Sequence, residues 1–154
     1  NLLPNGTFDE GLGGGWTTDD PVNITHDNTG QGSPENPENA IKLVSSTQNR
    51  HLFSPLVEVG GGNNYTISGY LDIRQIADGE VGFYIDEYDD ALNWISGQYI
   101  MGISIISTGD FGFAYIPTSI FVTHSALQII LTANSDTLAY LDDIRWLESN
   151  SSPL

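Results

Sequence analysis

Apolar and polar residues alternate one by one in short runs along almost the whole chain, and apolar residues at helical spacing are nearly absent. The run at residues 65–74 is typical, with Tyr65, Ile67, Leu71 and Ile73 on its odd positions. Successive side chains of a β-strand point to opposite faces, so this pattern predicts a strand with one buried face. By the same reasoning we predict strands at residues 23–26, 40–44, 52–57, 65–75, 80–87, 94–106, 111–116, 126–132 and 138–147.

Residues that favour turns separate most of these runs. The sequences GGGNN at 60–64, ADG at 77–79 and TGD at 108–110 are rich in residues that tolerate the backbone angles of tight turns. A succession of short strands and turns predicts a β-sandwich or a β-barrel. The 154 residues suit one domain. We predict a single module at 1–148, followed at 149–154 (SNSSPL) by the start of a Ser/Pro-rich linker within a larger chain.

The chain is strongly acidic: 4 Lys and Arg residues stand against 20 Asp and Glu, which gives a net charge of −16. This charge repels phosphate backbones and anionic lipid surfaces, so we expect neither a nucleic acid nor a membrane as partner. A neutral polysaccharide is not repelled. The sequence has no Cys, which excludes disulfides and thiolate metal sites. With its many Gly, Asn, Ser and Thr residues and few Lys, this composition indicates a secreted or cell-surface bacterial module.

Three short motifs occur in order along the chain. NLLPNGTFD at 1–9 is followed by GW at 15–16, YTISGY lies at 65–70, and AYLDDI lies at 139–144. Together they resemble the calcium-binding jelly-roll carbohydrate-binding modules that are attached to bacterial glycoside hydrolases and bind glucans and xylans. The resemblance implies an all-β, two-sheet antiparallel β-sandwich (jelly roll) with the two ends of the chain close together. The chain departs from the family pattern at 19–39, and at position 9, where Asp replaces the commoner Glu.

The strands predicted at 65–75 and 80–87 carry the most informative polar faces. With Val81, Phe83 and Ile85 pointing inward, we expect these two strands to be neighbours that expose tyrosines and charged residues together. Sugar rings stack on aromatic rings, and their hydroxyl groups need polar partners nearby. Trp94, Gln98 and Tyr99 could extend this surface. The residues that we predict to bind ligand are Tyr70, Asp72, Arg74, Tyr84, Asp86, Tyr88, Trp94 and Gln98.

Two alternatives remain open for this surface. The aromatic residues could pack within the protein, because a slip of one residue in the strand register turns an outer row inward. Arg74 beside Asp72 or Asp86 could form only a surface ion pair, which contributes little.

Asp142 is the candidate metal ligand. Strict alternation places Tyr140, Asp142, Ile144 and Trp146 on one face, so the Asp142 carboxylate would point into the core and need a cation or several donors. In keeping with the family resemblance, we expect a structural Ca²⁺ held by Asp142, Asp9 and carbonyl groups near Thr7, since Ca²⁺ takes 6–8 oxygen ligands. Alternatively, Asp142 and Asp143 bond to backbone amides or to Arg145.

These observations predict a non-catalytic carbohydrate-binding module that tethers an appended enzyme or a cell surface to a β-glucan, xylan or mannan. We expect it to be a monomer within a multidomain chain. One alternative is an adhesive jelly-roll module of a surface or phage particle that binds a protein. Another is a small β-sandwich lyase or hydrolase that uses Asp72 and Asp86 as a carboxylate pair. A zinc hydrolase is not expected, because His26, His51 and His124 are scattered.

Overall fold

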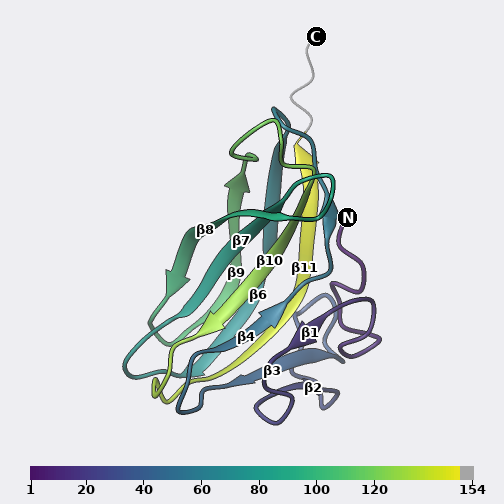
Figure 1. Cartoon of the computed structure of the whole chain (residues 1–154). Helices are drawn as coiled ribbons and strands as arrows, with labels where there is room; N and C mark the ends of the chain where they lie inside the picture. The colour runs from purple at the N-terminus through teal and green to yellow at the C-terminus, as the bar shows by residue number, and fades with distance from the viewer. Residues whose placement is uncertain (150–154) are drawn as a thin grey trace.

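Two antiparallel β-sheets stacked face to face make up the protein (Figure 1). The computed structural model describes residues 1–149, and this part of the chain contains strands but no helix. It therefore contains no helix long and apolar enough to cross a membrane. Sheet A consists, in order, of β1 (Thr17–Thr18), β4 (Arg50–Phe53), β10 (His124–Leu131), β7 (Val81–Tyr88) and β8 (Trp94–Ile103), with β5 (Val57–Glu58) also paired to β10. Sheet B consists of β2 (Ile24–Asp27), β3 (Ala40–Val44), β11 (Leu138–Ser149), β6 (Asn64–Gln75) and β9 (Ser107–Tyr115). The predicted all-β, two-sheet antiparallel sandwich is confirmed.

The core lies between the sheets and is built from the inward rows of their strands. The apolar residues that alternation assigned to the inside of β6 and β7 are all buried: Tyr65, Ile67, Leu71, Ile73, Val81, Phe83 and Ile85. Across the sandwich, the rings of Phe83 and Phe111 lie 4.5 Å apart. Burying an aliphatic or aromatic side chain of this size contributes about 1.5–3 kcal/mol, so these rows hold the sheets together.

Several of the predicted strand boundaries are wrong, and β1 was not predicted. The strand expected at 52–57 is divided into β4 and β5, with Ser54, Pro55 and Leu56 between them, because proline has no amide hydrogen to donate. The strand expected at 94–106 ends at Ile103, and β9 begins at Ser107, so the turn predicted at 108–110 lies inside β9. The turn between β8 and β9 contains Ile105 and Ile106, two exposed apolar residues in a position where polar turn residues are usual.

The expected pairing of the strands at 65–75 and 80–87 is also wrong. β6 belongs to sheet B, between β11 and β9, whereas β7 belongs to sheet A, between β10 and β8. Strands that follow each other in sequence are often neighbours, but in this fold the turn at 76–80 crosses from one sheet to the other. The outward rows of β6 and β7 therefore lie on opposite surfaces of the sandwich.

A β-bulge in β11 changes which residues point inward. Asp143 has a φ of 53°, and the pairing of β11 with β6 shifts register between Asp142 and Arg145. Contrary to strict alternation, Tyr140 and Asp142 lie on the outer side of sheet B, whereas Ile144 and Trp146 are buried in the core. Asp142 is nevertheless fully buried, because the loop at 28–39 covers it and Ser33 donates its amide hydrogen to the carboxylate.

The two ends of the described chain lie together. The amide of Leu2 donates to the carbonyl of Trp146 at 2.8 Å, and Figure 1 shows the N-terminus beside β11. Ser149, assigned from the sequence to the linker, is the last residue of β11 and pairs with Asn64. The rest of the expected linker, residues 150–154, lies outside the described part of the chain.

Candidate functional site

The outer face of sheet A exposes an aromatic surface that we call the platform, defined by Tyr84, Asp86, Trp94, Tyr99 and Gln128. Trp94 and Tyr99, on the edge strand β8, are 60% and 53% exposed. Tyr84 on β7 meets Tyr99 edge to face, with ring centroids 5.0 Å apart. Large aromatic residues grouped in the open commonly mark a binding surface.

The register of the strands arranges the platform in rows. One row aligns Tyr99, Tyr84 and Gln128 across β8, β7 and β10. The next aligns Gly97, Asp86 and Ala126, and the third aligns Trp94, Tyr88 and His124. Two rows with aromatic residues thus flank a middle row in which two of the three side chains are small or absent. The small residues of the middle row leave room for the side chains of the rows beside them.

Asp86 fixes the geometry of the platform. Its Oδ1 accepts a hydrogen bond from Trp94 Nε1 at 3.1 Å, and its Oδ2 accepts one from Gln128 Nε2 at 2.6 Å. A methyl group on Gly97 would lie 3.5 Å from the Trp94 ring, so the indole extends over this glycine. A ring that is already held in place loses little conformational freedom when a ligand stacks on it.

A hollow of about 560 Å³ opens at the other end of the platform, beside Tyr84 and Tyr99. Tyr99 donates its hydroxyl hydrogen to Glu80 Oε1 at 3.2 Å, and this bond raises the pKa of the tyrosine. Further along the same face, the rings of His51 and Phe53 on β4 stack 5.6 Å apart. His51 also pairs with Asp19 at 2.5 Å.

No positively charged side chain lies on the platform. Of the four Lys and Arg residues in the chain, Lys42, Arg74 and Arg145 belong to strands of sheet B. Arg50 lies at the end of β4, paired with Asp20 at 3.3 Å. The platform carries the carboxylate of Asp86, and Glu80 lies beside it against Tyr99, so it suits a neutral ligand with hydroxyl groups better than an anion.

The structure separates the predicted ligand residues into three groups. Tyr84, Asp86, Tyr88 and Trp94 lie on the outer face of sheet A, as a common site requires. Gln98 aligns with the buried Ile85 and lies 3.5 Å from Ser96, so it is on the other side of β8. The remaining three, Tyr70, Asp72 and Arg74, are on the outer face of sheet B.

On sheet B, two of the predicted ligand residues, Asp72 and Arg74, already have partners in the protein. Arg74 pairs with Asp72 at 3.0 Å and lies over the ring of Tyr140 at 4.5 Å. Thr108 donates to the other oxygen of Asp72 at 2.8 Å. These contacts agree with the alternative that Arg74 and Asp72 form a surface ion pair and do not bind a ligand. A hollow of about 360 Å³ on this face, between Ser33 and Arg145, has no aromatic residue in its wall.

The ligand residues predicted from the sequence omit several residues of this face of sheet A. Tyr99 was predicted only as an extension of the site, His51 was weighed only as a zinc ligand, and Glu80, Gln128 and Phe53 were not predicted. Alternation along β10 does predict that Gln128 points to the outer face, because its neighbours Leu127 and Ile129 are buried. However, no local signal shows that β10 and β4 lie beside β7, because that pairing joins segments some 40 residues apart or more.

The surroundings of Asp142 fit an oxygen-liganded cation. Its Oδ2 accepts from the Ser33 amide at 2.8 Å, its Oδ1 is buried without a partner, and burial raises its pKa to about 6. A methyl group on Gly32 would lie 2.2 Å from Asn36 O, 2.6 Å from Asn39 O and 2.8 Å from Asp142 Oδ2, so three oxygens converge there. Carbonyl and carboxylate oxygens are the ligands that Ca²⁺ prefers.

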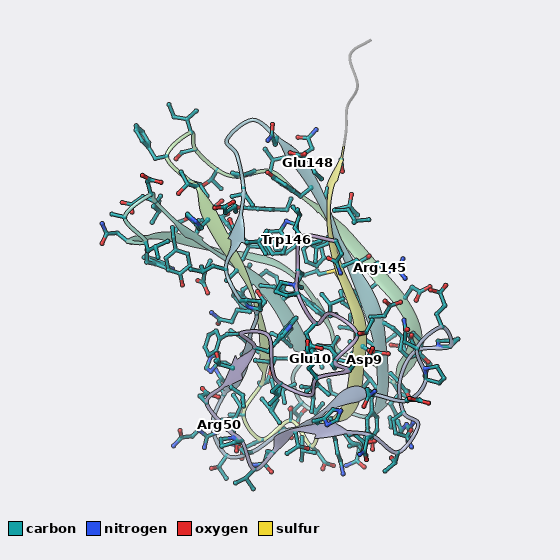
Figure 2. All side chains as sticks on the ribbon, turned by 90° about the vertical axis from the view of Figure 1, so that its right-hand side faces the viewer. Asp9, Glu10, Arg50, Arg145, Trp146 and Glu148 are labelled. Atoms are coloured by element: carbon teal, nitrogen blue, oxygen red, sulfur yellow. The ribbon has the colours of Figure 1, made fainter. Side chains whose placement is uncertain are left out.

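The other predicted metal ligands lie close to this position. Ile144 donates its amide hydrogen to the carbonyl of Gly6 at 2.8 Å, which brings Thr7 beside the bulge of β11. Asp9 accepts a hydrogen bond from Asn39 Nδ2 at 3.2 Å, and Figure 2 shows Asp9 where the N-terminal segment passes β11. Within residues 1–149, no three acidic or His side chains group as a metal site, so backbone carbonyls would have to complete the shell. The alternative, in which Asp142 and Asp143 bond to backbone amides or to Arg145, also agrees with part of the structure. Asp143 pairs with Arg145 at 3.2 Å.

Solved structures of other proteins share this fold. No protein-family model and no curated protein sequence matches the chain. The enzymatically active domain of tailspike protein 4 from bacteriophage CBA120 is similar, with a TM-score of 0.73, 11% identity, and coverage of 97% of this chain but only 21% of the tailspike chain. A family 16 carbohydrate-binding module has a TM-score of 0.70, 14% identity, and coverage of 96% of this chain and all of the module. TmCBM61, solved with β-1,4-galactotriose, has a TM-score of 0.62, 13% identity, and coverage of 97% and 99%. At such identities the likeness establishes the fold alone, which is a two-sheet antiparallel jelly roll.

Proposed function

We propose that the protein is a non-catalytic carbohydrate-binding module and that the sheet A platform is its glycan-binding surface. The observation that carries this proposal is the exposed Trp94 ring, held by Asp86 and aligned on one sheet face with Tyr84 and Tyr99. Aromatic rings offer the apolar face of a sugar a stacking partner, and the adjoining carboxylates and amides accept and donate hydrogen bonds at its hydroxyl groups.

Features of the wider molecule favour the same function. The fold is shared with a family 16 carbohydrate-binding module and with a module solved in complex with a galactotriose. The platform is open and lacks cations, which favours a neutral polysaccharide of the β-glucan, xylan or mannan class. Its role would be to tether a larger secreted bacterial protein to that polysaccharide, as a monomeric module that raises the local concentration of its partner domain.

Catalysis by the two carboxylates singled out in the sequence is not compatible with this arrangement. Asp72 lies on β6 in sheet B and Asp86 on β7 in sheet A, on opposite outer faces. A glycosidase needs its two carboxyl groups about 5–9 Å apart, on either side of one glycosidic bond. The pair therefore cannot act on a common substrate.

We also propose that a structural Ca²⁺ binds beside Asp142, held by that carboxylate, by Asp9 and by carbonyls of the N-terminal segment near Thr7 and of the loop at 28–39. The buried and unpartnered Asp142 Oδ1 and the convergence of oxygens next to Gly32 support this assignment. The ion would join the N-terminal segment and the loop to β11, and it would offset the cost of burying the carboxylate.

Affinity electrophoresis against soluble glucans, xylans, mannans and galactans tests the glycan proposal. We expect at least one class to retard the wild-type protein and Trp94→Ala to abolish the retardation. Tyr70→Ala, on the opposite face, is the matched control and should bind like wild type. Tryptophan fluorescence gives a second readout, because Trp16 and Trp146 are buried and only Trp94 is open to a quencher that bound glycan would exclude. If no class of glycan retards the wild type, the adhesive alternative replaces this proposal.

A further inference from the structure

Glu80 occupies an unusual place at one end of the platform. The neighbouring strands β7 and β8 present two aligned glycines there, Gly82 and Gly102. A methyl group on Gly102 would lie 2.1 Å from Glu80 Oε2 and 2.2 Å from its Cδ, and one on Gly82 would lie 2.8 Å from Oε2. The carboxylate of Glu80 therefore lies flat on the sheet, in the space that two side chains would otherwise fill.

The position of Glu80 is fixed from both sides. Its backbone amide donates to Thr132 Oγ1 at 3.0 Å, and its carbonyl accepts from the Thr132 amide at 3.3 Å. Tyr99 donates to Oε1 at 3.2 Å, whereas Oε2 accepts no hydrogen bond from residues 1–149. One carboxylate oxygen is thus engaged, and the other remains available to an incoming donor.

The hollow around this carboxylate has the chemistry of a sugar subsite. Its volume of about 560 Å³ is bounded by the rings of Tyr84 and Tyr99 and also by Asn49 and Thr132. Asn49 uses its Oδ1 to accept from the Ala133 amide at 2.8 Å, which leaves its side-chain amide group as a donor. The wall contains no Lys or Arg. A carboxylate or sulfate on a ligand would therefore be repelled by Glu80, with no positive charge nearby to offset the repulsion.

We propose that Glu80 is the specificity-determining residue of this subsite and that it accepts hydrogen bonds from adjacent hydroxyl groups of a neutral sugar stacked on Tyr84 or Tyr99. Gly82 and Gly102 are then required because they leave room for the carboxylate on the floor of the site. The same carboxylate makes the subsite reject uronic acids and sulfated sugars. This inference rests on the proposed function and identifies the sugar chemistry that the platform selects.

Isothermal titration of Glu80→Gln with a soluble glycan that binds the wild type tests the proposal. The substitution preserves shape but removes the charge, and loss of hydrogen bonds to a charged acceptor should weaken binding about tenfold or more. Gly102→Ala should weaken binding as well, because its methyl group displaces the carboxylate. Gly112→Ala on β9 is the matched control, since the nearest atoms to its methyl group would be 3.6 Å away.

A second measurement compares xylan with glucuronic-acid-substituted xylan, and galactan with polygalacturonate. The wild type should prefer the neutral member of each pair, and Glu80→Gln should reduce that preference. If the wild type binds a neutral glycan and Glu80→Gln binds it equally tightly, the role of Glu80 is overturned while the proposed function stands. If the wild type binds none of these glycans, the proposed function fails, and this inference fails with it.

Discussion

Glu87 is a fully buried carboxylate that joins the two sheets. It lies on β7 in sheet A and accepts hydrogen bonds from Ser96 Oγ at 2.6 Å, from Tyr115 of sheet B at 2.6 Å and from the Thr118 amide at 3.0 Å. Burial alone would raise its pKa, but the bonds from Ser96, Thr118 and Tyr115 outweigh burial and hold the pKa below its ordinary value. Glu87 is therefore a charged group that the folded state stabilises.

The depressed pKa of Glu87 fixes the sign of a pH dependence. Its contribution to stability is fully present above the unfolded pKa of 4.5 and is lost as the pH falls from there through the lower pKa of the folded state. We expect Glu87→Gln to be less stable than wild type at pH 7 by about 1.5–3 kcal/mol, because its amide group cannot accept the same set of bonds. The difference should shrink in acid, as the pH falls through the lowered pKa of the folded state and the wild-type carboxylate becomes protonated. Urea unfolding at pH 7 and at a series of decreasing pH values measures it; a gap that stays constant over the whole range in which the wild type is folded would contradict this account.

The N-terminal segment has no strand before Thr17, and the side chain of Asn5 organises it. Asn5 Nδ2 donates to the carbonyls of Gly11 at 3.0 Å and Gly13 at 2.9 Å, and Asn5 Oδ1 accepts from the Glu10 amide at 3.1 Å. This loop holds the buried Phe8 against Trp16, with ring centroids 4.9 Å apart.

Replacing Asn5 should loosen this loop. The residue has a φ of 52°, which glycine adopts freely and alanine does not. Asn5→Gly should lower the free energy of unfolding by about 1–3 kcal/mol through the lost hydrogen bonds. Asn5→Ala should lower it by about 1 kcal/mol more, because of backbone strain. Urea denaturation of both variants separates the two effects. Wild-type midpoints for both would show that the Asn5 side chain does not hold the loop.

Individual strands show which features of the fold could be predicted from the sequence. Alternation correctly assigned the inward rows of β6 and β7, because each strand is regular and one of its faces is packed in the core. It failed in β11, where the backbone conformation of Asp143 inserts a bulge that alternation cannot detect. The site was predicted only in part for a different reason. Trp94 and Asp86 could be identified within their own strands, but which strands share a sheet depends on long-range packing, so Tyr70 and Tyr84 were placed together in error.

At the scale of the whole molecule, the two proposed sites lie on opposite outer faces. The platform is on sheet A, and Asp142 is on the outer side of sheet B beneath the loop at 28–39. The sandwich core lies between them, so no side chain of one site contacts the other within the described chain. Calcium should therefore contribute to stability without contributing contacts to the glycan.

This separation predicts different responses to a chelator. Removing calcium should lower the melting temperature by about 5–10 °C, if calcium was previously at about 100 times its dissociation constant. Asp142→Ala should melt at a lower temperature than wild type in calcium and should not respond to the chelator, whereas Trp94→Ala should respond as wild type does.

Sodium chloride at matched ionic strength is the necessary control, because a chain with a net charge of −16 is stabilised by any screening cation. Glycan affinity, measured well below the melting temperature, should be unchanged by the chelator. A melting temperature that is the same in calcium, chelator and matched sodium would remove the metal from this account, whereas affinity lost together with calcium would place the glycan on the Asp142 side of the sandwich.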